Sequence, residues 1–235
     1  MNLFPVAILA GGLATRLRPM TERVPKALLE IAGRPFIDHQ LQLLAGQGVS
    51  RVVLCVGYLG EMIRDVVKDG SSFGLQVAYS FDGEKLLGTG GALRRALPML
   101  GRNFFVLYGD SYLPSSLRAV QEAYLGGDTP VLMAVVRNAN RWDTSNVIYR
   151  DSRIIEYNKR SPRPEMDCID YGLGILSEDV LAAWPSDQPF DLADVYESLS
   201  REGRLGGFEV NERFYEIGSP EGIRETEQFL SSRRG

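Results

Sequence analysis

The amino-acid sequence predicts an α/β fold in which helices flank a mixed, mostly parallel sheet, with a small antiparallel part late in the chain. Three observations support this fold class. Short apolar runs, of the length of a buried strand, recur through the first half of the chain. Segments with apolar residues at helical spacing separate these runs. Glycines follow several of the runs directly, where the chain must turn sharply.

Strands and helices alternate through the first half of the chain. We expect buried strands at residues 6–9, 51–56, 76–80 and 104–108. We expect helices at residues 35–46, 61–68 and 92–100, the last one opened by the glycine-rich residues 88–91. Because ligands bind beyond the carboxyl ends of parallel strands, the loops that carry Gly11, Gly57 and Asp110 should share one edge of the sheet.

The second half of the chain predicts further strands, some of them antiparallel. We expect strands at residues 130–137, 146–149, 153–157, 168–176, 205–210 and 214–217, with a hairpin at residues 146–157. Helices should begin at Ser177, Asp191 and Ser219, since each of these side chains can cap a first turn. We expect one globular domain over residues 1–235, divided loosely into a part of residues 1–137 and a part of residues 138–235.

The bulk composition excludes several classes of protein. A net charge of −4 implies no general attraction to nucleic acid. The chain shows neither a membrane-spanning apolar run nor a signal peptide, so we expect a cytoplasmic protein without a membrane partner. Cys55 and Cys168 lie in apolar segments and should be buried free thiols. The one histidine, His39, should lie near the surface of a helix, and a single histidine argues against a zinc site.

The stretch of residues 6–26 carries the strongest functional signal. Its apolar strand breaks into Gly11-Gly12, which lets backbone N–H groups approach a large ligand. Arg16 and Lys26 follow, so the stretch offers main-chain donors, a planar guanidinium and a compact ammonium, which together suit a polyphosphate. The loop is neither a Walker A motif nor GxGxxG, which argues against a dinucleotide-dependent oxidoreductase.

The string from Gly11 to Thr21, followed by Pro25-Lys26, resembles the signature of sugar-1-phosphate nucleotidylyltransferases, GGxGTRLxPxT followed by PK. Ala14 replaces a glycine that is usual there, and alanine is mildly costly if the position needs a positive φ. The resemblance implies a Rossmann-like, GT-A-like fold and catalytic roles for Arg16 and Lys26. It also implies that a nucleotide binds at Leu9, Ala10, Gly11, Gly12, Ala14, Thr15, Gly57, Gly88 and Thr89.

Asp110 closes an apolar strand, where a carboxylate can hold a hard cation without burying its charge in the core. Mg²⁺ takes few carboxylates, together with waters and phosphate oxygens. The resemblance implies that Asp110 holds a catalytic Mg²⁺. The stretch of residues 214–220 resembles the family's late motif, which implies that Glu216 is a second ligand in place of the usual aspartate. Glutamate is longer by one methylene, so either the metal geometry shifts or a water intervenes.

The segments that should contact the sugar depart most from the family pattern. The family's Glu-Lys-Pro element becomes Glu156 and Lys159, with two residues between them and no proline after them. Either Lys159 reaches the sugar phosphate by a changed backbone path, or it is a surface lysine. Asp170 replaces a family asparagine and can accept hydroxyl hydrogen bonds, but it cannot donate while ionised. The resemblance implies sugar-phosphate contacts from Tyr112, Asn146, Glu156, Lys159, Asp170 and Gly172.

The resemblance implies transfer of a nucleoside monophosphate from an NTP to a sugar 1-phosphate, with release of pyrophosphate. Residues 1–137 would bind the nucleotide and residues 138–235 the sugar phosphate. Positive charge would neutralise the repulsion between the two anions, and an already ionised phosphate needs no general base. The protein would act as a monomer or a homodimer.

Several interpretations stay open within and beyond this family. The short bacterial heptose 1-phosphate guanylyltransferases resemble the chain most, on Gly57-Tyr58-Leu59 and on residues 87–91. Glucose- or muramate-type enzymes, and cytidylyltransferases that act on choline or phosphonate compounds, are near alternatives. A catalytically inactive domain that senses nucleotide sugars is a further one, and the presence of Arg16, Lys26 and Asp110 together argues against it.

Overall fold

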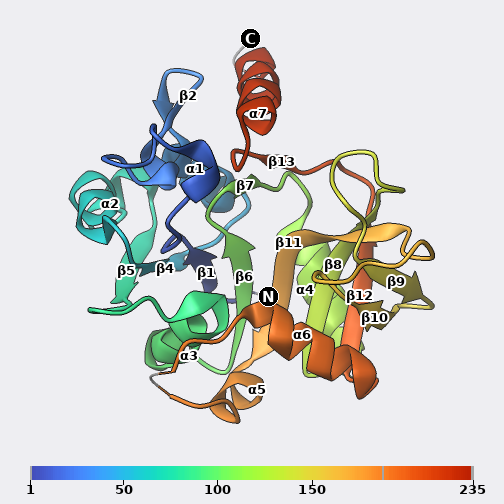
Figure 1. Cartoon of the computed structure of the whole chain (residues 1–235). Coiled ribbons are helices and arrows are strands. Elements are labelled where there is room, and N and C mark those ends of the chain that lie inside the picture. The colour runs from blue at the N-terminus through green and yellow to red at the C-terminus, as the bar shows by residue number, and fades with distance from the viewer. Residues whose placement is uncertain (1, 187, 234–235) are drawn as a thin grey trace.

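The computed structural model describes residues 2–186 and 188–233, and its centre is one nine-stranded sheet (Figure 1). The strands are β1 Val6–Leu9, β4 Arg51–Val56, β5 Gln76–Phe81, β6 Asn103–Tyr108, β8 Val131–Arg137, β9 Val147–Arg150, β10 Arg153–Tyr157, β11 Cys168–Ser177 and β12 Leu205–Val210. Their order in the sheet is β5-β4-β1-β6-β11-β8-β12-β10-β9. The sheet therefore runs through both halves of the sequence.

The first half of the chain supplies four parallel strands, which confirms the predicted topology of this half. β1 pairs with β4 on one side and with β6 on the other, and β5 extends the sheet beyond β4. Val6 and Ile8 pack into the core layer on one face of the sheet, whereas Ala7 packs into the layer on the other face. Because both faces are covered, the strand is apolar throughout.

Six helices cover the two faces of this sheet in the described part of the chain. Those on one face are α1 Phe36–Gly46, α2 Gly60–Val67 and α4 Leu117–Gly126, and those on the other are α3 Gly88–Leu100, α5 Glu178–Ala182 and α6 Leu192–Arg201 (Figure 1). Asp191 caps α6 as predicted, because its carboxylate accepts a hydrogen bond from the Ala193 N–H at 3.0 Å. The α/β layering is therefore the expected one.

The second half of the chain turns the parallel sheet into a mixed one. β11 runs antiparallel to both of its neighbours, β6 and β8, while β12 lies parallel to β8. The hairpin of β9 and β10 follows beyond β12, and Val147 of β9 also pairs with Cys168 of β11. This end of the sheet therefore curls back on itself and forms the predicted antiparallel part.

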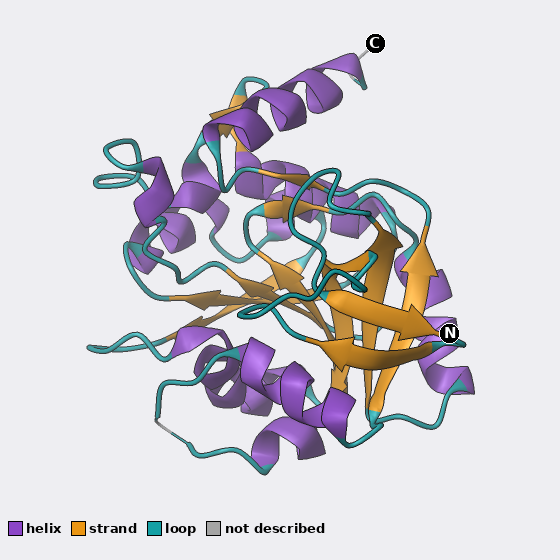
Figure 2. Cartoon of the chain, turned by 45° about the vertical axis from the view of Figure 1, so that its right-hand side comes forward, coloured by secondary structure: helices purple, strands orange, loops and turns teal. Residues whose placement is uncertain are grey.

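A third apolar layer lies above the carboxyl edge of the parallel strands. Its elements are β2 Glu30–Ile31, β3 Arg34–Pro35, β7 Ser111–Tyr112, β13 Tyr215–Glu216 and α7 Pro220–Ser232. Ser219 caps α7, because its hydroxyl accepts a hydrogen bond from the Gly222 N–H at 3.0 Å. The helix stands apart from the nine-stranded sheet, with the carboxyl terminus at its far end (Figure 2).

Several details differ from the sequence-based expectations. Helix α4 and the β2–β3 hairpin were not predicted. The prediction that His39 lies near the surface is wrong: it is 7% exposed, and its Nε2 lies 2.8 Å from the Ile31 carbonyl oxygen. Cys55 and Cys168 are buried free thiols, as predicted. Among the helices of residues 2–186 and 188–233, none has the length and hydropathy of a membrane span.

Candidate active site

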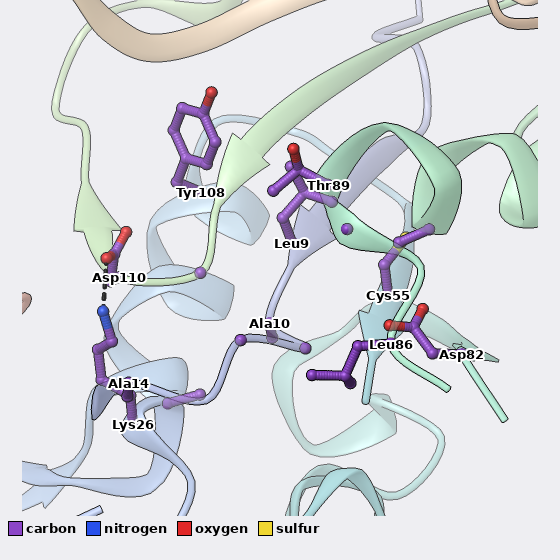
Figure 3. Close-up of a pocket in the computed structure, with 16 residues that line it drawn as sticks. Leu9, Ala10, Ala14, Lys26, Cys55, Asp82, Leu86, Thr89, Tyr108 and Asp110 are labelled. Atoms are coloured by element: carbon purple, nitrogen blue, oxygen red, sulfur yellow. Dashed lines mark hydrogen bonds and ion pairs between the residues drawn. The ribbon is translucent and has the colours of Figure 1, made fainter. Parts of the chain in front are cut away.

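A cavity of about 250 Å³ opens at the carboxyl edge of the parallel strands, and we call it the first cavity (Figure 3). Its wall comes from the loops after β1, β5 and β6, from Lys26 and from the start of α3. Loops from separate strands thus converge at one edge, as the topology predicts. Seven of the predicted nucleotide contacts line this cavity: Leu9, Ala10, Gly11, Gly12, Ala14, Gly88 and Thr89. Thr15 and Gly57 do not line it.

Three chain turns pack backbone against backbone beside the first cavity. A Cβ added to Gly11 would lie 2.9 Å from the Gly57 nitrogen, and one added to Gly57 would lie 2.8 Å from the Gly11 oxygen. A Cβ on Gly109 would lie 2.6 Å from the Leu9 oxygen. We expected Gly11 to admit a ligand, but the structure shows that neighbouring strand ends already require glycine there.

Gly12 and Ala14 form the part of the loop that faces open space. A Cβ added to Gly12 would meet nothing within 4 Å. Ala14 adopts φ 47° and ψ 41°, so this position does take the left-handed conformation that favours glycine. The Thr21 hydroxyl donates a hydrogen bond to the Ala14 carbonyl oxygen at 2.8 Å, which holds the strained turn in place. Space for a bound anion therefore lies beside Gly12.

The glycines that open α3 let the segment of Phe190 pack closely against the helix start. The N–H groups of Gly90 and Gly91 donate to the Phe190 carbonyl oxygen at 3.0 and 3.3 Å. A Cβ on Gly90 would lie 2.3 Å from the Phe190 ring. We expected a flat ring of a ligand and free N–H donors at these glycines. In the structure the ring that packs against Gly90 is that of Phe190, and the Phe190 carbonyl oxygen accepts the N–H groups. Thr89 does face the first cavity, and its hydroxyl donates to Asp191 at 2.7 Å.

Asp110 is held at the mouth of the first cavity by contacts from distant elements. The Gln40 amide of α1 donates to the carbonyl oxygens of Tyr108 and Ser111, at 3.0 and 2.8 Å, and so fixes the turn that carries Asp110. Lys26 Nζ lies 2.7 Å from Asp110 Oδ2, with both side chains only partly exposed (Figure 3). The ion pair places a cation and a carboxylate side by side, where phosphate charge could be balanced.

A second cavity, of about 360 Å³, lies on the antiparallel side of the same strand ends. Six predicted sugar-side, catalytic or metal residues line it together with Asp110: Arg16, Asn146, Lys159, Asp170, Gly172 and Glu216. Tyr108 and Asp110 belong to the walls of both cavities. Ligands in the two cavities would therefore meet at Asp110.

A bulge in β11 turns Asp170 toward the second cavity. The pairing of β11 with β8 shifts register between Asp170 and Gly174, and Gly172 within the bulge has φ +85°. The Asn146 side-chain oxygen accepts the Asp170 N–H at 3.0 Å, and Asp170 Oδ1 accepts the Gly172 N–H at 2.9 Å. The three residues thus act together: Asn146 supports the bulge that carries the carboxylate.

The carboxylate of Asp170 is electrostatically unusual. Burial raises the pKa of Asp170 to about 6, although the Gly172 N–H, the Lys159 charge and the Tyr108 hydroxyl all act in the opposite direction. Lys159 Nζ also lies 5.9 Å from the centre of the Tyr108 ring. Lys159 is therefore a lining residue of the second cavity rather than a distant surface lysine, in spite of its changed spacing from Glu156.

Strand pairing brings the two predicted metal ligands together. β13 pairs with β7 so that Glu216 lies opposite Ser111, and the Ile217 N–H donates to the Asp110 carbonyl oxygen at 2.9 Å. The Glu216 carboxylate accepts hydrogen bonds from the Gly218 N–H and from the Ser219 hydroxyl. Glu216 thus turns toward the start of α7, which its extra methylene allows.

Two predicted sugar contacts do not reach the second cavity. Glu156 forms an ion pair with Arg163 and does not line the cavity. Tyr112 is 8% exposed, and its ring packs against Phe229 of α7 with centroids 6.0 Å apart. Both residues lie on strands close in sequence to residues that do line the cavity, so their positions in the sequence did not distinguish them from lining residues.

The sequence-based analysis also missed residues that line the cavities. Asp82, which follows β5 directly, lines the first cavity, and Trp142 and Asp143 line the second. An acid at the carboxyl end of a parallel strand was the available signal for Asp82, which follows β5 directly, as it was for Asp110, which lies two residues beyond β6. The loop that carries Trp142 follows β8, and its approach to Phe214 depends on long-range packing.

The fold is that of an α/β protein with two adjoining cavities at the carboxyl edge of its parallel strands, which share Tyr108 and Asp110 in their walls. Residues 6–140 match the family described as Nucleotidyl transferase. Since this match covers more than half of the sequence, the chain belongs to the nucleotidyl transferase family. It is a nucleotidyltransferase, an enzyme of the kind that the opening loop indicates.

Individual relatives agree over almost the whole chain. D-glycero-alpha-D-manno-heptose 1-phosphate guanylyltransferase of Aneurinibacillus thermoaerophilus is 29% identical over 228 residues, with 95% of this chain and 96% of the relative covered. N-acetylmuramate alpha-1-phosphate uridylyltransferase of Caulobacter vibrioides is 27% identical, with 91% of each chain covered. The solved structure of HddC from Yersinia pseudotuberculosis complexed with GMP-PN has a TM-score of 0.81 at 27% identity, covering 97% of this chain and all of that chain.

Proposed function

We propose that this protein transfers a nucleoside monophosphate from an NTP to a sugar 1-phosphate and releases pyrophosphate. One observation carries the proposal: Tyr108 and Asp110 line both cavities, so a nucleotide in the first cavity would present its phosphates to a sugar phosphate in the second. Relatives that match nearly the full chain are named as transferases of this kind. Residues 1–137 would bind the nucleotide, and residues 138–235 the sugar phosphate.

The triphosphate would lie between Gly12, Lys26 and Arg16. Gly12 leaves open space beside the main chain, and Lys26 supplies a cation at the mouth of the first cavity. Arg16 lines the second cavity beside Asp110, so it lies on the side from which the sugar phosphate approaches. These charges would offset the repulsion between two anionic substrates, which is the main barrier to bringing them together.

The sugar phosphate would lie in the second cavity. Lys159 is the cation there that suits its phosphate, and Asp170 offers oxygens that accept hydrogen bonds from sugar hydroxyls. A phosphate oxygen of the sugar 1-phosphate attacks the α-phosphorus of the NTP, a new P–O bond forms, and pyrophosphate leaves from the opposite side. The attacking oxygen is already ionised at neutral pH, so no residue has to remove a proton.

Asp110 and Glu216 are the residues that would hold Mg²⁺. Glu216 lies on β13 and Asp110 lies in the turn just before its partner strand β7, and both carboxylates line the second cavity, so they fit a hard cation that shares phosphate oxygens with the substrate. When bound, the ion supplies positive charge that stabilises the negative charge developing on the transferring phosphate. Lys26 pairs with Asp110 in the structure and would move to the phosphates when the ion and the NTP arrive.

A matrix of substrates tests this proposal directly. Pyrophosphate release is measured for each of ATP, GTP, CTP and UTP against a set of hexose and heptose 1-phosphates, with Mg²⁺ present. We expect release in one NTP column and only when a sugar 1-phosphate is added. Omission of the sugar phosphate and addition of EDTA are the two controls. Nucleotide binding without release in any combination would favour a nucleotide-sugar sensor and overturn the proposal.

A further inference from the structure

The segment that leads into β13 alternates between the second cavity and helix α7, which follows it (Figure 1). Phe214 lines the cavity. Tyr215 turns the other way, and its ring stacks on Phe229 of α7 with centroids 3.8 Å apart. Arg213 turns the same way as Tyr215 and forms an ion pair with Glu225 of α7. One face of this short segment therefore contacts the cavity, and the other contacts α7.

The loop after β8 presents Trp142 to the same cavity, and it is built around one buried amide. The side-chain oxygen of Asn138 accepts the Trp142 N–H at 3.0 Å. The Asn138 amide donates to the Asp143 carbonyl oxygen, and to the Ser145 hydroxyl at 3.1 Å. These contacts fix the main chain of the loop, and they leave the orientation of the Trp142 ring to side-chain packing.

The Trp142 ring is held from outside its own loop. Arg213 Cζ lies 5.4 Å from the centre of the Trp142 ring and 5.1 Å from that of Tyr215, both within the range of a cation–π contact. The Phe214 ring meets the Trp142 ring at 77°, with centroids 6.1 Å apart. Arg141 also lies over Trp142, at 5.5 Å, but it belongs to the same loop and cannot anchor that loop to another element.

The Arg213 side chain takes this position at the expense of a hydrogen bond. Its Nε is buried and has no hydrogen-bond partner within residues 2–186 and 188–233, while its Nη2 pairs with Glu225. An unpaired buried donor is destabilising, so the contacts with two rings and one carboxylate have to offset that effect. A guanidinium suits the position because it is planar and can lie against rings while its edge reaches a carboxylate.

We propose that Arg213 is a positioning residue that holds the Trp142 ring in the wall of the second cavity, so that helix α7 helps to shape the binding of the sugar phosphate. Arg213 lines neither cavity and would act through Trp142. A ring that leaves the wall lets water into the cavity and removes apolar contacts from the ligand, so the sugar phosphate binds less tightly. The inference rests on the proposed function for the ligand that occupies this cavity.

Fluorescence tests the contact without any ligand. The sequence has two tryptophans, so a Trp184→Phe protein reports on Trp142 alone. In that protein, Arg213→Gln should increase the quenching of Trp142 by acrylamide and lower its anisotropy, because the ring loses its anchor. Arg141→Gln is the matched control, since it removes the same charge from over the same ring and should leave both values unchanged. Unchanged values in Arg213→Gln would overturn the inference.

Steady-state kinetics tests the consequence for the sugar phosphate, with the pair of substrates that releases pyrophosphate fastest. Arg213→Gln should raise the KM for the sugar phosphate about 2- to 30-fold, the range for one cation–π contact, and leave the NTP KM unchanged. Arg213→Lys keeps the charge, but its compact ammonium cannot lie flat against two rings, so it should recover only part of the loss. Full recovery would show that charge alone acts, and would overturn the inference.

A double-mutant cycle separates the action through Trp142 from a general loss of charge. Trp142→Leu should itself raise the KM for the sugar phosphate, and Arg213→Gln should then add almost nothing to it. Additive effects would overturn the inference. Thermal unfolding checks each variant. If Arg213→Gln does not fold, Glu225→Gln takes its place, and it should shift the quenching and the KM in the same directions, because Arg213 loses its partner on α7.

The outcomes also distinguish this inference from the proposed function. If no pair of substrates releases pyrophosphate, the hexose and heptose 1-phosphates are titrated into the Trp184→Phe protein and read by the fluorescence of Trp142. Weaker binding after Arg213→Gln would then support the inference while the proposed transfer is refuted. No binding of any of these sugar phosphates would overturn both.

Discussion

The two cavities that meet at Asp110 are built in different ways. The wall of the first cavity is largely main chain and small residues from loops that follow parallel strands, such as Gly11, Gly12 and Gly88. The wall of the second is largely polar and aromatic side chains, such as Lys159 and Asp170, from antiparallel strands and a bulge. One wall is built mostly from small residues of loops, and the other presents charged and polar side chains.

This difference explains where the chain departs from the family pattern. A triphosphate is the same in every NTP, so one loop sequence that offers backbone N–H groups and cations can bind it in every member of the family. Sugars differ in the positions of their hydroxyl groups, so a wall that reads them must vary in its side chains. Asn146, which stands where the family usually has a glycine, lies on the second wall together with Lys159 and Asp170. The first wall carries one departure, Ala14 in place of a glycine. The comparison can be tested by removing one group at a time.

The largest effect is expected from Asp110→Asn, because Asp110 belongs to both walls. The variant loses a charge that would hold Mg²⁺ between the substrates, so kcat should fall at least about 100-fold. Pyrophosphate release at saturating substrates measures this. Asp128→Asn is the matched control, since Asp128 pairs with Arg153 on the exposed surface. Near-normal kcat in a folded Asp110→Asn protein would contradict the central place of Asp110.

Lys159→Ala should weaken binding in the second cavity and leave binding in the first cavity unchanged. Lys159 lines the second cavity and not the first, so its loss should raise the KM for the sugar phosphate about 10- to 100-fold and leave the NTP KM almost unchanged. Steady-state kinetics with each substrate varied in turn measures both values. Arg160→Ala is the control, because Arg160 is exposed and pairs with Asp194. Equal increases in both KM values would show that the two walls are not independent.

Asp170→Asn should change the pH dependence of the second cavity. The pKa of Asp170 is about 6, so wild-type Asp170 gains a proton and loses its charge as the pH falls through 6. The phosphate of the substrate also titrates near 6, but it does so equally with both proteins. The ratio of wild-type to variant kcat/KM for the sugar phosphate should therefore fall below about pH 6. The titratable neighbours that face Asp170 are Lys159, Tyr108, Tyr157 and Tyr196.

Asp170→Asn should also change the free energy of unfolding, in a direction that the pKa of Asp170 fixes. The pKa of Asp170 in the folded protein lies above its ordinary value of 3.8, so the ionised carboxylate destabilises the fold. This destabilisation is fully present above about pH 6, and it is relieved as the pH falls from about 6 towards 3.8. Asp170→Asn should therefore raise the free energy of unfolding at neutral pH and have less effect near pH 4. Thermal unfolding across this range would contradict the assignment if the difference between the proteins stayed constant.

The smallest effect is expected in the loop of the first cavity. Ala14 has φ 47°, where alanine is strained by about 1–2 kcal/mol, while glycine loses about 0.4–1 kcal/mol through its greater freedom in the unfolded chain. Ala14→Gly should therefore raise the free energy of unfolding by about 1 kcal/mol or less, seen as a small rise in Tm. Ala123→Gly in helix α4 is the matched control and should lower it by about 1 kcal/mol. A loss of stability in Ala14→Gly would show that the turn does not store strain.

Much of the fold followed from local pattern. The strands of the parallel half were predicted almost to the residue. Both faces of β1, β4 and β6 are buried, so each reads as a largely apolar run, whereas β5 lies at the edge of the sheet and is only partly buried. Helix α4 was missed, although its sequence carries a capping residue. The Ser116 side-chain oxygen caps the helix by accepting a hydrogen bond from the Ala119 N–H at 3.3 Å. His39 was misplaced because a third layer, formed by β2, β3 and α7, covers α1 from outside the sheet. Such a layer leaves no periodic signal in the helix that it covers.

The site was predicted unevenly for a physical reason. The loop of residues 10–14 and Lys26 lie in one short stretch, and Asp110 ends a recognisable strand. Glu156 was expected in the second cavity, but the Arg163 guanidinium holds its carboxylate elsewhere, and no local pattern announces that pairing. Monomer or homodimer assembly, the absence of nucleic-acid binding and a cytoplasmic location stay predictions.

The sequence by itself determined the α/β class, the parallel half of the sheet and the glycine-containing loop for which we propose anion binding, because these depend on short-range periodicity and on residues close together in the chain. Only the tertiary structure decided that Glu216 lies opposite Ser111, that Gly90 receives Phe190 and that Asp82 faces the first cavity. Each of these depends on pairing between segments far apart in sequence, where strand register and the packing of turns fix the direction of a side chain.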